Sequence, residues 1–478
     1  MRRADAPARP DGWQGGTGRG AGLEGDSATA RLQPGRPPGR RRAAREVPGR
    51  AGDAPAPPRA MPGPRRRGIR ARRDPPYPCR VTPAPWIAPL AATLLMQSVA
   101  SGMGQLLPVL APLLTADAGI PPESIGPLNA TGAIGTILFL LFGGAILARL
   151  GPVRALQAGT AVAALGLLLA GFGTLPALLG AALLLGIGYG PTPPAGSRIL
   201  AATAPARHRS LIFSIKQAGA PAGGVLAGLL AAPAAAAFGW PATLALAVAL
   251  ALLCALAIQP LRAALDVERD GARGVSPRAL LARANLAAPF AALRVDPLLL
   301  PLTVLGLGFA VAQGCLFAFC VTWLVEAHGM GLVAAGSVFA AMQGAGIVAR
   351  IALGWLADRT GRAARNLVVQ AFAAAGMLAL LGLLPAGTPA WVLTAVAVGN
   401  GFLAASWNGI VMAEVARLAP PARIQDATSG STLVVFCGYV LGPALFGALV
   451  PLLGGWGFPF LVVAVQLAVG GGLMIRRI

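Results

Sequence analysis

The sequence predicts an all-α membrane protein of twelve transmembrane helices, arranged as two parallel six-helix bundles with both chain ends on the cytoplasmic side. Hydrophobic residues make up 55% of the 478 residues, charged residues make up 12%, and the mean hydropathy is +0.68. Water-soluble chains of this length do not have that composition. From Trp86 onward, apolar segments of about 20 residues follow one another, each long enough to cross a hydrocarbon core ~30 Å thick. A short loop motif also occurs twice, which indicates a duplicated bundle.

Each apolar segment is expected to be a helix, because a chain in lipid must satisfy its own backbone hydrogen bonds and these segments are too long and too uniformly apolar for barrel strands. The expected spans are residues 86–114, 124–148, 153–173, 175–200, 209–232, 238–259, 297–324, 333–357, 364–385, 389–415, 425–450 and 455–475. In the fourth span, the Gly- and Pro-rich stretch from Gly186 to Pro194 should interrupt the helix.

Four regions follow from this pattern: residues 1–80, a first bundle at 86–259, a charged linker at 260–296, and a second bundle at 297–475. Residues 1–80 contain 19 Arg against 7 Asp or Glu, with many Pro and Gly, a composition typical of disorder. Such a basic arm can bind anionic lipid, but with only Trp13 and Tyr77 as aromatic residues and no folded module we expect no nucleic-acid partner. A true start near Met61 or Val81 is an alternative.

Arginines set the expected orientation. If both ends are cytoplasmic, every cytoplasmic segment contains Arg, as at Arg149 and Arg359, whereas the six opposite loops contain neither Lys nor Arg. This asymmetry is the positive-inside pattern. We expect a multi-pass protein of a bacterial inner membrane.

The repeated motif joins the second and third spans of each half. Gly354-Trp-Leu-Ala-Asp-Arg-Thr-Gly-Arg362 lies 210 residues after Gly144-Ala-Ile-Leu-Ala-Arg-Leu-Gly151. That offset pairs Gly144 with Gly354, Arg149 with Arg359 and Gly151 with Gly361. Equal topology in the two halves indicates a parallel repeat about an axis along the membrane normal, which is transporter architecture.

The motif resembles the G-x-L-A-D-R-x-G-R signature of the major facilitator superfamily, and the resemblance covers about residues 86–478. It implies a secondary transporter that works by alternating access, with the gating residues Gly144, Arg149, Gly151, Gly354, Asp358, Arg359, Gly361 and Arg362. In the family the acidic residue helps to hold the inner side shut, so we expect Asp358 to meet the start of the fifth span near Arg209. Alternatively, Asp358 and Arg359 only anchor a loop. The first copy departs from the signature, with Ala148 at the acidic position and Pro152 in place of the last arginine, so gating need not be symmetric.

Lys216 is the only lysine among 39 basic residues. It lies about 10 Å into the fifth span at 1.5 Å per residue, where a charge costs roughly 3 kcal/mol and should face a cavity. It can bind an anion, pair with an acid or exchange a proton. Alternatively, it extends along the helix to the nearby surface.

Other polar residues at membrane depth are candidates for binding substrate. The resemblance implies that the first, fourth, seventh and tenth helices line a central cavity. The candidates are Gln97, Gln105, Tyr189, Gln313, Asn400, Trp407, Asn408 and Tyr439. For each, an interhelical hydrogen bond is an equally good interpretation.

Three further charges lie within the spans: Arg198, Arg350 and Glu414. They favour anionic cargo modestly, but we rank a structural ion pair above a substrate role for Arg350 and Glu414. The sequence contains no catalytic constellation, no metal-ligand spacing among its cysteines and no nucleotide-binding motif, so we expect no enzyme activity, metal or cofactor.

The sequence therefore predicts a monomeric transporter of a small solute, preferably a small organic anion, driven by a proton or substrate gradient. A drug or metabolite exporter coupled to protons is the alternative, and a membrane sensor without transport is a third hypothesis. Substrate identity and transport direction do not follow from the sequence.

Overall fold

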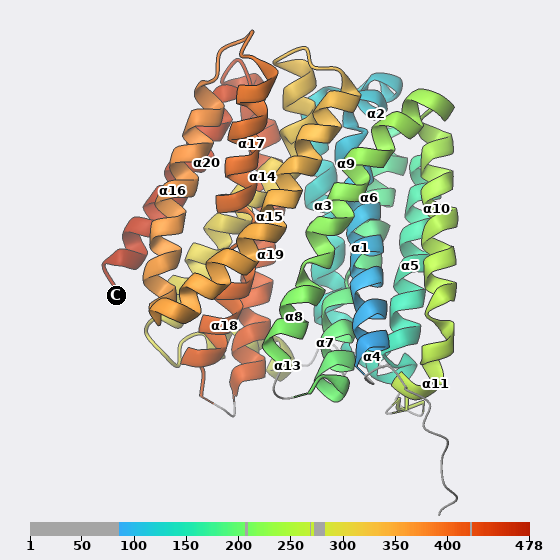
Figure 1. Cartoon of the computed structure of the whole chain (residues 1–478), viewed down its shortest axis with the longest axis vertical. Helices are drawn as coiled ribbons and strands as arrows, with labels where there is room; N and C mark the ends of the chain where they lie inside the picture. The colour runs from blue at the N-terminus through green and yellow to red at the C-terminus, as the bar shows by residue number, and fades with distance from the viewer. Residues whose placement is uncertain (1–85, 206–208, 268, 272–282, 421–422) are drawn as a thin grey trace, which may run out of the picture. The chain divides into compact units, whose positions relative to one another are not determined.

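The computed structural model describes residues 86–478 apart from 206–208, 268, 272–282 and 421–422 (Figure 1). The prediction of disorder for residues 1–80 falls outside these residues. In the first half the helices are α1 (Ile87–Val109), α2 (Ala111–Ala118), η1 (Pro122–Ser124), α3 (Ile125–Phe142), α4 (Gly144–Leu150), α5 (Pro152–Ala170), α6 (Leu175–Tyr189), α7 (Thr192–Thr203), α8 (Arg209–Gln217), α9 (Gly219–Phe238) and α10 (Trp240–Ala257).

The remaining helices begin after the sixth span. They are η3 (Gln259–Leu261), α11 (Arg262–Leu265), α13 (Arg283–Ala292), α14 (Leu299–Glu326), α15 (Leu332–Thr360), α16 (Ala363–Leu383), α17 (Ala390–Ala404), α18 (Asn408–Leu418), α19 (Ile424–Leu452) and α20 (Gly457–Ile475). Within the described residues, twelve helical runs are long and apolar enough to cross a bilayer. The all-helical, twelve-span prediction is therefore confirmed.

Several spans are interrupted helices. The fourth span ends one helix at Tyr189 and starts the next at Thr192, with Gly190 and Pro191 between them, as the sequence predicted. Proline suits the first turn of α7 because that turn has no helical partner for its N–H groups. Four further interruptions were not predicted: at Leu110 between α1 and α2, at Gly143 between α3 and α4, at Ala218 between α8 and α9, and at residues 405–407 between α17 and α18.

Helix packing repeats in the two halves (Figure 1). In the first half α1 packs against α9 and α3 against α6; in the second, α14 packs against α19 and α15 against α17. The halves meet through two equivalent pairs, α3 with α19 and α9 with α15. These matched contacts confirm two parallel six-helix bundles.

Glycines bring the two bundles together at one end of the molecule. A Cβ on Gly126 of α3 would lie 2.2 Å from the carbonyl oxygen of Pro443 in α19, and a Cβ on Gly336 of α15 would lie 2.5 Å from that of Gly228 in α9. Any larger residue would push the backbones apart. Gly126 and Gly336 are partners under the 210-residue offset, so the repeat preserves this contact. We call this the closed end.

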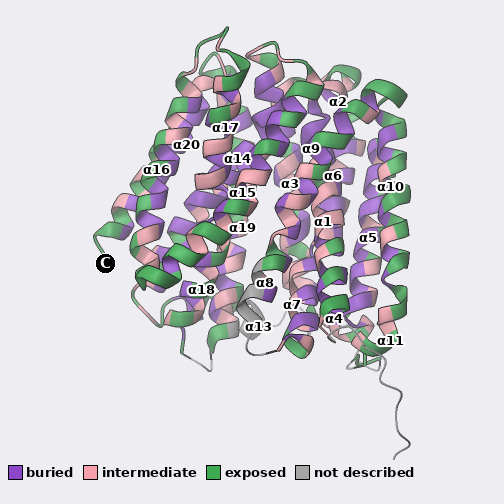
Figure 2. Cartoon of the chain, viewed as in Figure 1, coloured by how far each residue is buried: buried purple, intermediate pink, exposed green. Residues whose placement is uncertain are grey.

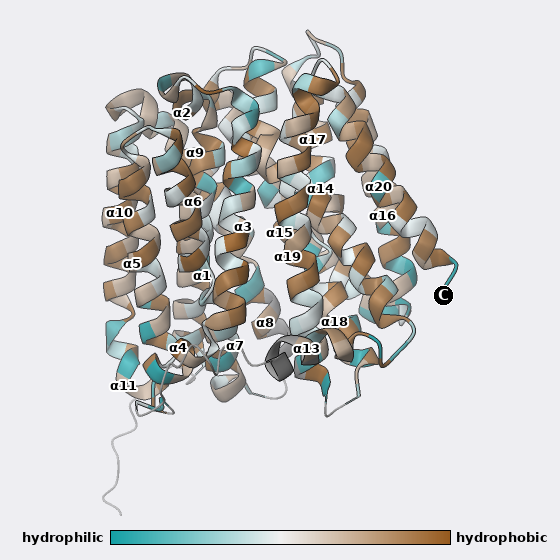
Figure 3. Cartoon of the chain, turned by 180° about the vertical axis from the view of Figure 1, so that it is seen from behind, coloured by the Kyte–Doolittle hydropathy of each residue, from teal (hydrophilic) through white to brown (hydrophobic). Residues whose placement is uncertain are grey.

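The other end of the bundles carries the arginines, including Arg149, Arg262, Arg359 and Arg417, and we call it the arginine-rich end. Figure 3 shows hydrophilic residues gathered around α4, α11 and α18 at this end, while the helices between the two ends are largely apolar. Large apolar side chains such as Leu250, Leu253 and Val369 are exposed along the outer helices (Figure 2), as expected of surfaces that face lipid.

Candidate functional site

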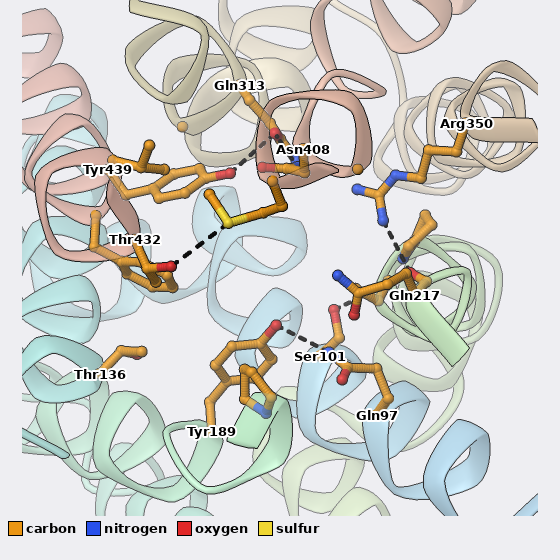
Figure 4. A pocket seen from close by; sticks show the side chains of 18 of the residues that line it. Gln97, Ser101, Thr136, Tyr189, Gln217, Gln313, Arg350, Asn408, Thr432 and Tyr439 are labelled. Carbon is orange, nitrogen blue, oxygen red and sulfur yellow. Dashed lines mark hydrogen bonds between the residues drawn. The ribbon is translucent and has the colours of Figure 1, made fainter. Parts of the chain in front are cut away.

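A cavity of about 1510 Å³ lies between the two bundles. Its walls include Asp358, Arg417 and Asp426, which lie near the arginine-rich ends of α15, α18 and α19. It stops below the glycine contacts of the closed end, since Pro443 is in its wall but Gly126, Gly228 and Gly336 are not. The cavity therefore extends to the arginine-rich end (Figure 4 shows its interior).

Seven of the nine predicted substrate-binding residues line this cavity. They are Gln97, Gln105, Tyr189, Lys216, Gln313, Asn408 and Tyr439. They come from α1, α6, α8, α14, α18 and α19, so helices of both bundles contribute.

Lys216 lies in the last turn of α8 and is only 2% exposed. Its Nζ donates a hydrogen bond of 3.2 Å to Oε1 of the adjacent Gln217. Its stem packs on α7, where a Cβ on Gly196 would be 2.7 Å from Lys216 Cε. The side chain is thus buried in the cavity wall rather than extended to the surface. Within the described residues, no carboxylate forms an ion pair with it.

Arg350 of α15 holds the two bundles together inside the cavity. Its Nη1 donates to the carbonyl oxygen of Gln217 in the first bundle at 2.9 Å, and its Nη2 donates to that of Ala405 in the second at 3.1 Å. Nε also donates to Ala405, at 3.3 Å. Figure 4 shows the guanidinium pointing at Gln217. Among the described residues Arg350 has no ion pair, and the partners it has there are backbone carbonyl oxygens.

Both acceptors of Arg350 lie where a helix is interrupted. In an α-helix the Gln217 carbonyl would accept from the N–H of residue 221, but that residue is Pro221 and has no N–H. Ala405 lies between α17 and α18. The interruptions therefore free the two carbonyl oxygens that a buried guanidinium needs. Gln217 was not singled out from the sequence, although the proline four residues later was a usable signal.

Two Gln and Tyr pairs face each other across the cavity (Figure 4). In the first bundle, Gln97 Nε2 donates to the Tyr189 hydroxyl at 3.0 Å. In the second, the Tyr439 hydroxyl donates to Gln313 Oε1 at 2.9 Å. The Tyr189 hydroxyl therefore keeps its own hydrogen to donate, whereas the Tyr439 hydroxyl has used its hydrogen.

Gln313 Oε1 also accepts from Trp407 Nε1 at 3.0 Å and from Asn408 Nδ2 at 3.3 Å. Since the indole N–H can only donate, it fixes the amide orientation and leaves the NH₂ group of Gln313 available to a solute. Trp407 is fully buried and stacks on Phe309, with ring centroids 5.7 Å apart. It supports Gln313 from behind and does not line the cavity.

Gln105 and Asn400 differ in position. Gln105 lines the cavity, and its Oε1 is buried with no partner among the described residues. Asn400 is fully buried away from the cavity, where its Nδ2 donates to the carbonyl oxygens of Val396 and Met377. Asn400 thus makes the interhelical hydrogen bond that was the other interpretation of these polar residues.

The other two charges within the spans have different settings. Glu414 lines the cavity and forms a bidentate pair with Arg417 at 2.6 and 2.8 Å, which is the structural role expected of it. Arg198 does not line the cavity, and its charge acts instead on Asp266 in the linker.

The second copy of the loop motif ends a continuous helix. Gly361 caps α15 with φ +62°, a left-handed conformation that glycine adopts without strain. Gly354 has open space around it, Arg359 lies over the Trp355 ring at 5.2 Å, and Arg362 is the N-cap residue of α16. Asp358 is exposed at the mouth of the cavity. The side chain of Arg209 lies outside the described residues, so the pairing of Asp358 with it stays a prediction.

The first copy is built differently. The helix is interrupted at Gly143, directly before Gly144, and Arg149 is exposed. Gly151 has φ +85°. Beyond it, Asp266 of the linker accepts hydrogen bonds from the N–H groups of Val153 at 2.7 Å and Arg154 at 3.2 Å.

Linker residues also reach the loop at the position of the missing acid. The N–H of Asp270 donates to the carbonyl oxygen of Ala148 at 3.0 Å. Burial raises the pKa of the Asp266 carboxyl above its ordinary value, against the opposing effects of the Val153 N–H and of Arg262 and Arg198. An acid from the linker thus caps α5 beside the loop whose own acid is absent. The sequence alone did not indicate this role for Asp266.

No group of three or more His, Cys, Asp or Glu side chains that could hold a metal ion occurs in the described part of the chain.

Comparisons with known proteins agree with this architecture. The family model of the Major Facilitator Superfamily matches residues 91–429. An uncharacterized MFS-type transporter of Mycobacterium tuberculosis (strain CDC 1551 / Oshkosh) is 26% identical over 344 residues, covering 71% of this chain and 74% of that protein.

Two solved structures share the fold at low identity. A bacterial homologue of the human lysosomal transporter Spinster, in an inward-facing and occupied conformation, has a TM-score of 0.64 and 15% identity, over 81% of this chain and 95% of that one. A mutant of the peptide transporter POT has a TM-score of 0.63 and 15% identity, over 81% and 93%.

Proposed function

The chain belongs to the Major Facilitator Superfamily, and from this premise we propose that it transports a small organic anion across a bacterial inner membrane by alternating access. Membership makes it a multi-pass membrane transporter. The choice of an anion depends on one observation: Lys216 and Arg350, the two cations in the interior of the cavity, have no carboxylate partner among the described residues.

Charge balance supports this choice. Glu414 is already neutralised by Arg417, and Asp358 and Asp426 lie near the mouth. A cation at membrane depth without a partner is unfavourable by several kcal/mol. A carboxylate or similar group between Lys216 and Arg350 would offset that cost, so an anionic solute is favoured over a cationic one.

Hydrogen-bond donors support it as well. A guanidinium has five N–H donors, and Arg350 uses three of them on carbonyl oxygens. The remaining two, with the Lys216 ammonium, the Tyr189 hydroxyl and the Gln313 NH₂ group, form a set of donors around the cavity. An acceptor-rich anion matches this set.

The two cations belong to different bundles, which suggests how binding drives alternation. Lys216 moves with the first bundle and Arg350 with the second. An anion bound between them screens their repulsion and lets the bundles close at the arginine-rich end, which we place on the cytoplasmic side from the distribution of arginines. The glycine contacts of the closed end then separate, and Asp358 approaches the start of α8. Coupling to protons or to exchange remains part of the proposal, as does a monomeric state.

Binding of mono- and dicarboxylates to the purified chain tests the anion directly. At least one should raise the unfolding temperature of the wild type, since a ligand stabilises the state it binds. The same anion should lose this effect in Lys216→Gln and keep part of it in Lys216→Arg, which retains the charge. Stabilisation by amphipathic cations that survives Lys216→Gln would instead favour the exporter hypothesis.

A further inference from the structure

A second, smaller pocket lies at the arginine-rich end, on the outside of the first bundle. It has a volume of about 420 Å³ and is lined by Arg154, Gln259, Pro260, Arg262, Ala263, Asp266 and Arg269. Three arginines and one aspartate give its lining a formal charge of +2. The pocket does not share a residue with the central cavity, so the transport site does not account for it.

A buried acid, Asp266, joins the linker to the start of α5 beside Arg154. Asp266 is 5% exposed and is bonded to the first N–H groups of α5, and its Oδ2 lies 4.0 Å from Arg154 Nε. Gly151 makes room for it, because a Cβ there would lie 2.7 Å from Asp266 Cγ. The hydrogen bond from the Asp270 N–H to the Ala148 carbonyl oxygen attaches the linker to the first loop at a second point. The linker is therefore docked on the bundle rather than loosely attached.

Two of the arginines keep their charge available. Arg262 is half-buried and Arg269 is exposed, and neither forms an ion pair with a carboxylate in the described part of the chain. The one acid in the pocket already accepts two backbone hydrogen bonds. The pocket thus offers guanidinium groups suited to the oxygens of a phosphate.

A lipid-facing stripe leads to this pocket. Leu246, Leu250, Leu253 and Leu256 of α10 are 50% to 65% exposed, and their spacing places them on one face of the helix. Figure 2 shows exposed residues along this outer helix. Arg262 follows Leu256 by six residues, just beyond the end of α10 at Ala257 and the short helix η3.

We propose that this pocket binds the headgroup phosphate of an anionic phospholipid, whose acyl chains lie along the leucine stripe of α10. Arg262 and Arg269 are its main ligands, and Arg154 is a third, weakened by its contact with Asp266. Basic pockets at the cytoplasmic ends of transmembrane helices attract anionic headgroups in this way. The occupied pocket would tie the linker and the first loop to the membrane surface.

Native mass spectrometry of the purified full-length chain tests the site, with phosphatidylglycerol as the probe and phosphatidylcholine as the zwitterionic comparison. The double variant Arg262→Gln with Arg269→Gln should bind phosphatidylglycerol roughly tenfold to thirtyfold more weakly than the wild type. A matched control, Arg476→Gln with Arg477→Gln, removes two exposed arginines elsewhere and should leave binding unchanged.

Two further arms identify the source of the phosphate. The double variant Leu253→Asn with Leu256→Asn should weaken binding of phosphatidylglycerol severalfold, because it removes contacts to the acyl chains. Inorganic phosphate should bind to the wild type far more weakly than the lipid does. Equal binding of phosphatidylglycerol by the arginine double variant and the wild type would overturn the site. Phosphatidylcholine binding as tight as phosphatidylglycerol, or phosphate binding as tight as lipid, would overturn the anionic lipid as its ligand.

Discussion

The two bundles share their packing but not their chemistry. Gly126 and Gly336 make equivalent contacts at the closed end, and α1 with α9 packs as α14 does with α19. The second helix, however, is interrupted at Gly143 in the first bundle and continuous as α15 in the second. The first loop is fastened to the linker through Asp266, whereas Asp358 of the second loop is exposed at the cavity mouth. Packing thus preserves the duplication, while the loops have taken different roles.

The cavity shows the same division. The first bundle supplies Lys216 and a tyrosine hydroxyl that can donate, and the second supplies Arg350 and a tyrosine hydroxyl that has already donated. In the proposed mechanism an anion binds between these two cations at the bundle interface, where its binding can be coupled to movement of the bundles.

The closed-end contacts test what the bundles share. Gly126→Ala and Gly336→Ala should each abolish most transport, because the new Cβ would meet a carbonyl oxygen at 2.2 or 2.5 Å. The measure is solute flux in proteoliposomes. Gly344→Ala is the matched control on α15, since its Cβ meets nothing within 4 Å, and it should transport normally. Equal flux in all three variants would show that the contacts are not needed.

Gln217 contacts both Lys216 and Arg350, and substitutions of its side chain test the role of charge at this position. Gln217→Glu would give Lys216 an internal carboxylate, which competes with an anionic substrate, so the KM for the anion should rise about tenfold or more. Gln217→Asn keeps a neutral amide and should change the KM far less. If the KM is unchanged in Gln217→Glu and transport still depends on Lys216, Gln217 does not take part in substrate binding. The proposal of an anionic substrate would still hold in that case.

The tyrosine pair tests the difference between the bundles. Tyr189→Phe removes a donor that is available to the anion, and we expect the KM to rise by about tenfold, as for a hydrogen bond to a charged group. Tyr439→Phe removes a hydroxyl whose hydrogen is already given to Gln313, so its effect should be about threefold or less. The reverse order would contradict the hydrogen-bond directions on which the anion proposal draws.

Substitutions of Asp266 test whether this residue joins the linker to the first loop, and the measure is the stability of the protein. Asp266→Ala should lower the free energy of unfolding by about 1 kcal/mol, the usual loss for a helix cap, whereas Asp266→Asn keeps a capping oxygen and should lose little. The raised pKa of the folded carboxyl makes its stabilising contribution largest at low pH. That contribution falls as pH rises from the ordinary Asp pKa of about 3.9 through the folded value.

The measurement is the unfolding temperature of the wild type and Asp266→Asn across this pH range. As the pH rises, the unfolding temperature of the wild type should fall relative to that of Asp266→Asn. A parallel pH dependence in both proteins would mean that Asp266 does not titrate differently in the folded state.

Much of the fold could be predicted because its signals are local or periodic. Apolar length gave the spans, and the 210-residue offset gave the two bundles. The break near Gly190 was visible because proline and glycine act on their own helix. The break at Ala218 was missed although Pro221 lies nearby, since small residues in a membrane helix also serve packing.

The site was predictable only in part. Polarity at membrane depth brought seven of nine candidates to the cavity wall, but it could not separate Asn400 and Trp407, whose partners Met377 and Gln313 lie on other helices. Asp266 was hidden for the same reason, because its bonds cross more than 100 residues of sequence. Such long-range partners follow from the packing and not from the pattern around a residue.

The most direct test of an anionic substrate is the flux of labelled solutes into proteoliposomes with an imposed proton gradient. The wild type and Lys216→Gln should be measured side by side. The panel should match small organic anions with amphipathic cations. We predict that the wild type accumulates at least one anion and that Lys216→Gln does not, although it inserts and folds normally. Cation flux that is equal in both proteins, or anion flux that survives the substitution, would contradict the account.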